Sequence, residues 1–243
     1  MKIYFVNLKR IMSVVSFVML LVLSVGITFG ILYLVDEKVV AAYAESSDYS
    51  KVIILDAGHG GEDSGAVGVN GALEKDLNLD ICNLIAENLR NEGYTVILTR
   101  EEDKMLYSEE ENIKGMRKLS DLKNRVKMIE KHPGATFVSI HMNSFGASKY
   151  SGLQVYYKNQ SDASEALAAS IQNKVKELLQ PDNNRKTKSG NNIYILENSP
   201  ITSVLIECGF LTNSDECQKL SEKEYQKQLS FAISCGIIEY IEK

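Results

Sequence analysis

The sequence predicts a single three-layer α/β domain, with a mostly parallel mixed sheet of about six strands and helices on both faces. Two observations predict this class. After residue 50, short apolar runs alternate with longer segments whose apolar residues recur at helical spacing. This alternation is typical of wound α/β domains with a largely parallel sheet. No repeat or low-complexity tract interrupts the order, and the remaining length suits one domain with a sizeable core.

The elements follow from the apolar pattern in chain order. Strands are expected at 51–55, 95–99, 136–140, 152–157, 192–196 and 203–207, and helices over 77–89, 119–129, 167–178 and 221–240. The last helix is expected to begin at Ser221, because Ser221 and Glu224 have the spacing of a capping box. Two polar segments are expected as loops: 101–118 as a solvated excursion, and 181–191 as a connection or, beside a cleft, a substrate contact.

The first 50 residues differ in kind from the rest. Residues 11–35 contain no charged side chain and are long enough to cross a bilayer as a helix, for which roughly 20 residues are needed. Basic residues precede this stretch, which predicts that residues 1–10 stay in the cytoplasm and that the following chain is exported. We therefore expect a membrane anchor over 11–35 and a linker over 36–50, with signal cleavage near Ala44 as the alternative. In both cases the domain over 51–243 is extracytoplasmic.

Charge and cysteine content exclude two classes of function. The formal net charge of −5, from 27 basic and 32 acidic residues, gives no basic footprint for nucleic acid. The four cysteines form no CxxC pair, so the chain has neither a zinc knuckle nor a thioredoxin-like motif. Most of them are expected to be small core residues, and their disulfide state stays open.

The glycine-rich stretch LDAGHGGEDSGA, which follows the first strand, does not have the spacing of a phosphate loop. A dinucleotide fingerprint would require glycine at position 63, which is Asp63. The P-loop spacing from Gly60 reaches Gly65, but no lysine follows. The same turn holds His59, one of only three histidines in the chain. A histidine just beyond a strand end indicates a metal site instead.

Four side chains are expected to meet at one edge of the sheet. His59 follows the first strand, His141 follows the strand at 136–140, and Glu207 closes the strand at 203–207, while Glu74 begins the helix after the glycine turn. Ligands in open α/β sheets bind beyond the carboxyl ends of the strands. Two histidines and a carboxylate suit a catalytic zinc site, and a second carboxylate can move the proton of its water. The alternatives are hydrogen-bonded structural histidines and a Glu74 that only favours the helix dipole.

Four blocks resemble the zinc-dependent N-acetylmuramoyl-L-alanine amidases of bacterial cell walls: ILDAGHGGEDSGAVGVNGALEKDLNL, VILTRE, FVSIHMNS and SVLIECGFLTN. The resemblance implies that His59, Glu74 and His141 hold one Zn²⁺ and that Glu207 is the catalytic acid/base. It also implies hydrolysis of the amide between the lactyl group of N-acetylmuramic acid and L-alanine of the stem peptide. One departure is visible, since Ala57 stands where the family usually has proline, and it affects no proposed ligand.

Two further residues are candidates for substrate binding. Arg100 either faces a carboxylate of the stem peptide or pairs with a local acid. Asn143 either contacts substrate or a ligand, or merely ends its strand.

An anchor followed by a bare catalytic domain resembles the sporulation-type amidases. These strip stem peptides in the spore cortex ahead of muramic-δ-lactam formation, a step needed for germination. Because the sequence shows no wall-binding repeat, we expect a secreted accessory protein as a partner besides peptidoglycan and the membrane. Two alternatives stay open: a membrane-tethered, non-catalytic peptidoglycan-binding or regulatory protein, and another zinc peptidase acting on stem-peptide bonds.

Overall fold

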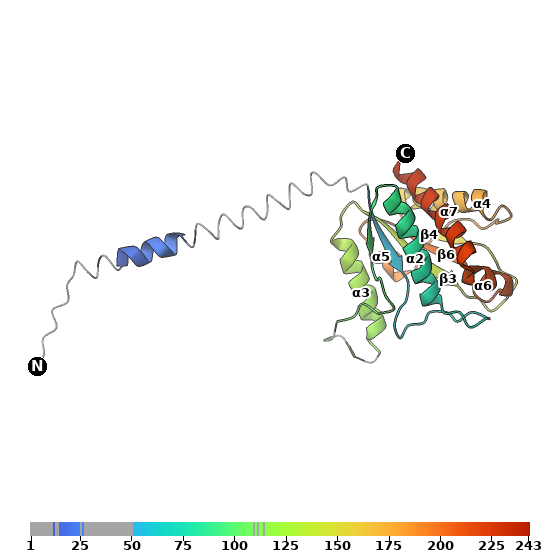
Figure 1. Cartoon of the computed structure of the whole chain (residues 1–243), viewed down its shortest axis with the longest axis horizontal. Coiled ribbons are helices and arrows are strands. Elements are labelled where there is room, and N and C mark those ends of the chain that lie inside the picture. The colour runs from blue at the N-terminus through green and yellow to red at the C-terminus, as the bar shows by residue number, and fades with distance from the viewer. Residues whose placement is uncertain are drawn as a thin grey trace, which may run out of the picture. The chain divides into compact units, whose positions relative to one another are not determined.

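The computed structural model describes residues 12, 15–24, 26, 51–108, 110, 112–113 and 115–243 (Figure 1). The chain divides into two compact units, Met1–Asp48 and Tyr49–Lys243. In the first unit residues 15–24 are helical. No helix among the described residues is long and apolar enough to cross a membrane. Most of the expected anchor over 11–35, and all of 1–10 and of the linker over 36–50 with the cleavage site near Ala44, lie outside the described residues.

The second unit is built on one six-stranded sheet, in the order β2-β1-β3-β6-β4-β5. All neighbouring strands run parallel except β4 and β6, which are antiparallel, so the sheet is mixed and mostly parallel as expected. The strands are β1 (Val52–Ala57), β2 (Thr95–Leu98), β3 (Thr136–Asn143), β4 (Gln154–Tyr157), β5 (Lys188–Ser189) and β6 (Thr202–Phe210).

Helices cover both faces of this sheet (Figure 1). Successive side chains of a strand point to opposite faces, so Leu55 enters the larger core and Ile54 the smaller one. The larger core packs under α2 (Glu74–Asn91), α4 (Asp162–Leu178), α6 (Ser214–Ser221) and α7 (Lys223–Ile241). The smaller core packs under α3 (Arg117–Glu130) and α5 (Tyr194–Asn198). Burial on both faces explains why these strands are apolar runs rather than alternating ones.

The expected strand at 192–196 is wrong, because its last three residues begin helix α5 and none of the run is in a strand. Neighbouring Ile195 and Leu196 are both buried in the smaller core, and a short apolar run does not distinguish a strand from a turn of buried helix. The remaining strand is β5, which lies inside the segment expected to be a polar loop and pairs with β4 through Tyr156 and Tyr157.

The capping box expected at Ser221 is also wrong. Ser221 ends α6, and its hydroxyl donates to the carbonyl of Cys217, while α7 starts two residues later without a side-chain cap. Asn213, whose side chain accepts hydrogen bonds from two backbone N–H groups, caps α6 instead. All four cysteines are free, and Cys82, Cys208 and Cys217 are buried, which confirms them as core residues.

Candidate metal centre and active site

His59 leaves β1 in a left-handed turn. Its φ is 62°, and Gly60 and Gly61 follow at 137° and 54°. A non-glycine residue at positive φ is uncommon, and such strain clusters at functional sites. Two contacts hold it: the His59 carbonyl accepts a hydrogen bond from Arg125 at 2.8 Å, and Nδ1 lies 2.9 Å from Oδ2 of Asp63. The turn thereby directs the imidazole toward the carboxyl edge of the sheet.

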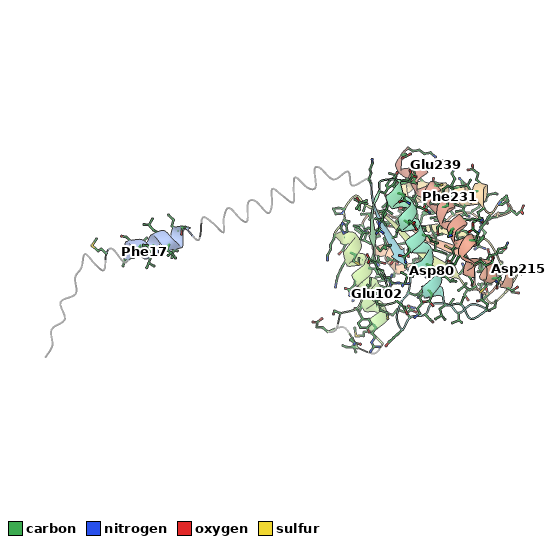
Figure 2. The ribbon with its side chains drawn as sticks, in the orientation of Figure 1. Phe17, Asp80, Glu102, Asp215, Phe231 and Glu239 are labelled. Carbon is green, nitrogen blue, oxygen red and sulfur yellow. The ribbon has the colours of Figure 1, made fainter. Side chains whose placement is uncertain are left out.

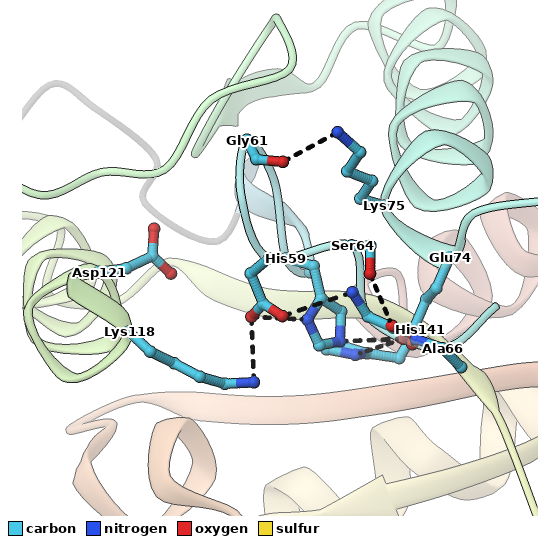
Figure 3. A network of polar contacts seen from close by, with 12 residues as sticks. His59, Gly61, Ser64, Ala66, Glu74, Lys75, Lys118, Asp121 and His141 are labelled. Carbon is cyan, nitrogen blue, oxygen red and sulfur yellow. Dashed lines mark hydrogen bonds and ion pairs between the residues drawn. The ribbon is translucent and has the colours of Figure 1, made fainter. Parts of the chain in front are cut away.

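Glu74 and His141 meet His59 at this edge (Figure 3). Glu74 is the first residue of α2 and only 4% exposed. Its Oε1 lies 3.0 Å from His141 Nδ1 and 3.2 Å from His59 Nε2, and its Oε2 accepts a hydrogen bond from the backbone of Ala66 at 2.7 Å. One ligand atom from each of the three residues lies within 4.8 Å of the others. The structure thus brings together all three residues that the sequence nominates as metal ligands.

The donor set fits a zinc ion. Two imidazoles and one carboxylate are a ligand set of catalytic zinc. The ring nitrogen of His59 that faces away from Glu74 contacts Asp63, and such an outer carboxylate orients metal-ligating histidines. The contacts among the three residues also explain the charge state of Glu74. Burial alone would raise the pKa of Glu74, but contacts with His141 and His59 outweigh it and hold that pKa well below its ordinary value. Glu74 is therefore a carboxylate anion, as a metal ligand at this position would be.

Two glycines make room for the ligands. A Cβ at Gly58 would lie 2.2 Å from Nε2 of His141, and a Cβ at Gly65 would lie 2.5 Å from Oε2 of Glu74. The glycines of the turn are needed for close approach of ligands as well as for its backbone conformation.

We expect Gly58→Ala to weaken zinc binding by about 10- to 100-fold, because the new methyl group must displace the His141 imidazole. Competition with a chromogenic chelator measures this affinity. Gly146→Ala is the matched control, since nothing lies within 4 Å of a Cβ there. Equal zinc affinities for the two variants would contradict the proposed position of His141.

Glu207 stands beside this cluster. The strands β3 and β6 extend further than expected, to Asn143 and Phe210, and their register places Glu207 opposite His141. Its Oε2 is buried and has no hydrogen-bond partner among the described residues. Burial raises the pKa of Glu207 to about 7, against the smaller opposing effect of the histidines. An unpartnered carboxyl with this pKa, at the edge of a candidate metal site, suits a general acid/base.

A buried ion pair that the sequence analysis missed supports the turn. Arg125 of α3 pairs with Asp56 of β1 and with Asp121, and it also donates to the carbonyls of Ala57 and His59. The sequence offers one sign of this ion pair, because Asp121 and Arg125 are four residues apart on a predicted helix. Because its other partners come from β1, the role of Arg125 could not be read from the helix alone.

Arg125→Ala is expected to lower the free energy of unfolding by about 3–5 kcal/mol, since it leaves the buried Asp56 carboxylate without its cation. Thermal or urea unfolding checks this. Arg90→Ala, at an exposed arginine of α2, is the control and should change the stability by less than about 1 kcal/mol. Similar losses in both variants would show that the buried pair has no special role.

Arg100 requires a correction. It is 2% exposed, and its guanidinium donates to the carbonyls of Ala57, Gly58, Lys75 and Glu102. Arg100 therefore braces the glycine turn against α2, and the expectation that it faces substrate or pairs with an acid is wrong. Every residue has a backbone carbonyl, so the sequence around Arg100 could not predict which carbonyls it would contact.

Asn143 ends β3 and is half-buried, and its carbonyl accepts a hydrogen bond from the backbone N–H of Leu211 at 2.8 Å. Substrate contact by its side chain stays a prediction. The excursion at 101–118 does more than expected. Asp103 contacts Gly61 and Lys75, and Lys118, labelled in Figure 3, lies 3.1 Å from Asp63.

The second unit of the chain matches known proteins over almost its whole length. A family model described as N-acetylmuramoyl-L-alanine amidase matches residues 53–239. The chain is 37% identical over 190 residues to the germination-specific N-acetylmuramoyl-L-alanine amidase of Bacillus subtilis, which covers 78% of this chain and 79% of that protein. The CwlD amidase of Clostridioides difficile, solved in complex with the GerS lipoprotein, is similar at a TM-score of 0.76 and 43% identity, over 79% of this chain and 98% of that one. The amidase AmiC2 of Nostoc punctiforme is similar at 0.69 and 33%, over 80% and 98%.

Proposed function

The chain belongs to the N-acetylmuramoyl-L-alanine amidase family, and we propose that it is a zinc-dependent hydrolase. In this proposal it cleaves the amide between the lactyl group of N-acetylmuramic acid and L-alanine of the stem peptide. The observation that carries the proposal is the convergence of His59, Glu74 and His141 within 4.8 Å, with Glu207 opposite His141 in the sheet.

The roles of the residues follow from their positions. Zn²⁺ held by His59, Glu74 and His141 would polarise the scissile carbonyl and lower the pKa of water to about 7. Glu207 accepts the proton of the attacking water and returns it to the departing amine, and a pKa of about 7 suits both steps. Asp63 accepts a hydrogen bond from the protonated Nδ1 of His59, which would leave the other ring nitrogen free to bind the metal.

Zinc content and muropeptide mass spectrometry of the purified protein test this proposal together. We expect one zinc per chain and release of stem peptides that begin with free L-alanine. Cleavage within the stem peptide would favour another zinc peptidase. A zinc-loaded protein that binds peptidoglycan without cleaving it would favour the non-catalytic alternative.

The proposed setting is the spore cortex, ahead of muramic-δ-lactam formation and in support of germination. The germination-specific relative from Bacillus subtilis and the likeness to CwlD support it. The enzyme would act outside the cytoplasm, held by residues 11–35 or released after cleavage near Ala44. Muropeptide analysis of spores that lack the protein is the test. An unchanged content of muramic-δ-lactam would reject the role in the spore cortex and would leave the proposed amidase activity standing.

An accessory protein is the proposed partner, in addition to the peptidoglycan substrate. The solved complex of the Clostridioides difficile CwlD amidase with a lipoprotein supports it. Co-purification from the native organism should recover an exported protein in near-equal amount. If the isolated protein is already fully zinc-loaded and active on cortex peptidoglycan, no such partner is required.

A further inference from the structure

A groove of about 640 Å³ lies next to the end of the sheet that carries Glu207. Residues 149–152, 179–185 and the start of α6 line it, and Asp215, labelled in Figure 2, lies on its α6 side. Because β4 runs antiparallel to β6, the beginning of β4 lies beside the carboxyl half of β6, with Gln154 opposite Glu207. The groove and the proposed catalytic carboxyl are therefore neighbours.

Arg185 lies between the groove and Glu207. It lines the groove, and its guanidinium donates a hydrogen bond to the side-chain oxygen of Gln154. The guanidinium carbon lies 4.8 Å from the centre of the Phe210 ring, which holds the group in place through a cation–π contact. The positive charge also opposes the effect of burial on the pKa of Glu207. A fixed cation thus stands between the groove and the proposed acid/base.

Within the described part of the chain, Arg185 forms no close ion pair. Among the described residues, no carboxylate oxygen lies within 4.0 Å of Arg185, and its Nε is buried without any hydrogen-bond partner. Burial raises the pKa of the nearby Glu216 and the charge of Arg185 partly opposes this, but the two Glu216 oxygens accept the backbone N–H groups of Gly152 and Phe210 and do not bond to Arg185. A half-buried guanidinium that forms no close ion pair is suited to an external carboxylate, which an arginine fork can bind.

The proposed reaction indicates which carboxylate comes here. Glu207 returns a proton to the departing amine, so that nitrogen must come within hydrogen-bonding reach of Glu207. The candidate zinc ligands lie on the β1 and β3 side of Glu207, and the groove lies on the β4 side. The peptide attached to the amine has room to extend into the groove, toward Arg185.

We propose that Arg185 binds the free α-carboxylate of the second stem-peptide residue, a glutamate linked through its side-chain carboxyl, and so positions the leaving peptide. This inference rests on the proposed amidase function. It makes Arg185 a substrate-binding residue within the segment 181–191, which was expected to be a connection or, beside a cleft, a substrate contact.

The test compares two muramoyl-tripeptides that differ only in this group, one with the α-carboxylate and one with the α-carboxamide. The wild-type protein is expected to cleave the carboxylate substrate with a kcat/KM about 10- to 100-fold higher. Arg185→Gln should remove this preference by lowering kcat/KM for the carboxylate substrate, with the carboxamide substrate changed by less than about threefold. Arg185→Lys keeps the charge and should retain part of the preference.

The matched control is Lys186→Gln, which removes one positive charge from the neighbouring exposed position and should keep the full preference. Thermal unfolding of each variant verifies its fold. A wild-type protein without preference, or an equal loss on both substrates in Arg185→Gln, overturns the inference while leaving the amidase function intact. Failure of the wild-type protein to cleave either substrate overturns the proposed function, and this inference with it.

Discussion

Glu207→Gln is expected to lower kcat of the amidase by about 10²- to 10⁴-fold while the protein retains its full zinc content. Glutamine has nearly the same shape as glutamate but cannot accept a proton from water or return it to the amine. The three candidate zinc ligands are unchanged, so metal binding should not respond. Initial rates of stem-peptide release and metal analysis of the same preparation measure both quantities.

Stability adds a second readout for Glu207. Burial raises the pKa of its carboxyl to about 7, so above that pH the folded protein carries a buried charge whose Oε2 has no partner. Glutamine removes this charge, and we expect Glu207→Gln to unfold at the same or a higher temperature at pH 8. Loss of activity with unchanged or increased stability is the pattern of a functional residue.

Glu87→Gln serves as the control, because Glu87 is an exposed glutamate of α2 and should keep wild-type activity. A Glu207→Gln protein that releases stem peptides at the wild-type rate would remove Glu207 from the mechanism. If this variant lost its zinc as well, Glu207 would belong to the metal site instead.

Replacement of any one of the three candidate ligands is expected to lower zinc affinity by at least about 100-fold and to abolish activity with it. The variants are His59→Ala, His141→Ala and Glu74→Ala. The reason is geometric: each residue supplies one of three donor atoms that lie within 4.8 Å of one another, and no other His, Cys, Asp or Glu among the described residues completes such a group. Metal analysis after dialysis, and activity after zinc is added back, measure the loss.

The chain supplies its own control for the histidines. His132, the third histidine, lies in the turn after α3, outside the candidate metal group, so His132→Ala should bind zinc normally. Glu74 also accepts the backbone N–H groups of Ala66 and Met142, so Glu74→Gln, which keeps an acceptor oxygen, separates the loss of zinc from a loss of stability. Full zinc occupancy in all three alanine variants would eliminate the proposed site.

The site was predictable to the extent that its residues carry a local signal. His59, His141 and Glu207 are polar residues at the ends of apolar runs, and Glu74 begins a helix, so their types and places could be read directly. Arg100 and Arg185 show the opposite case. Each is an arginine in or beside a polar segment, yet one is buried against backbone carbonyls and the other lies on a groove beside Glu207.

The sequence by itself determined the fold class and most strands and helices, because periodicity and residue type report which side chains are buried. It also predicted the four residues of the proposed centre, whose roles are those that the family resemblance implies. Only the tertiary structure decided that residues 194–198 form a helix, that Glu207 lies opposite His141, and that Arg185 reaches Gln154. These outcomes depend on strand order, register and the packing of segments remote in sequence. A buried polar group takes its partner from whichever segment packs against it, and that segment is chosen by the whole fold.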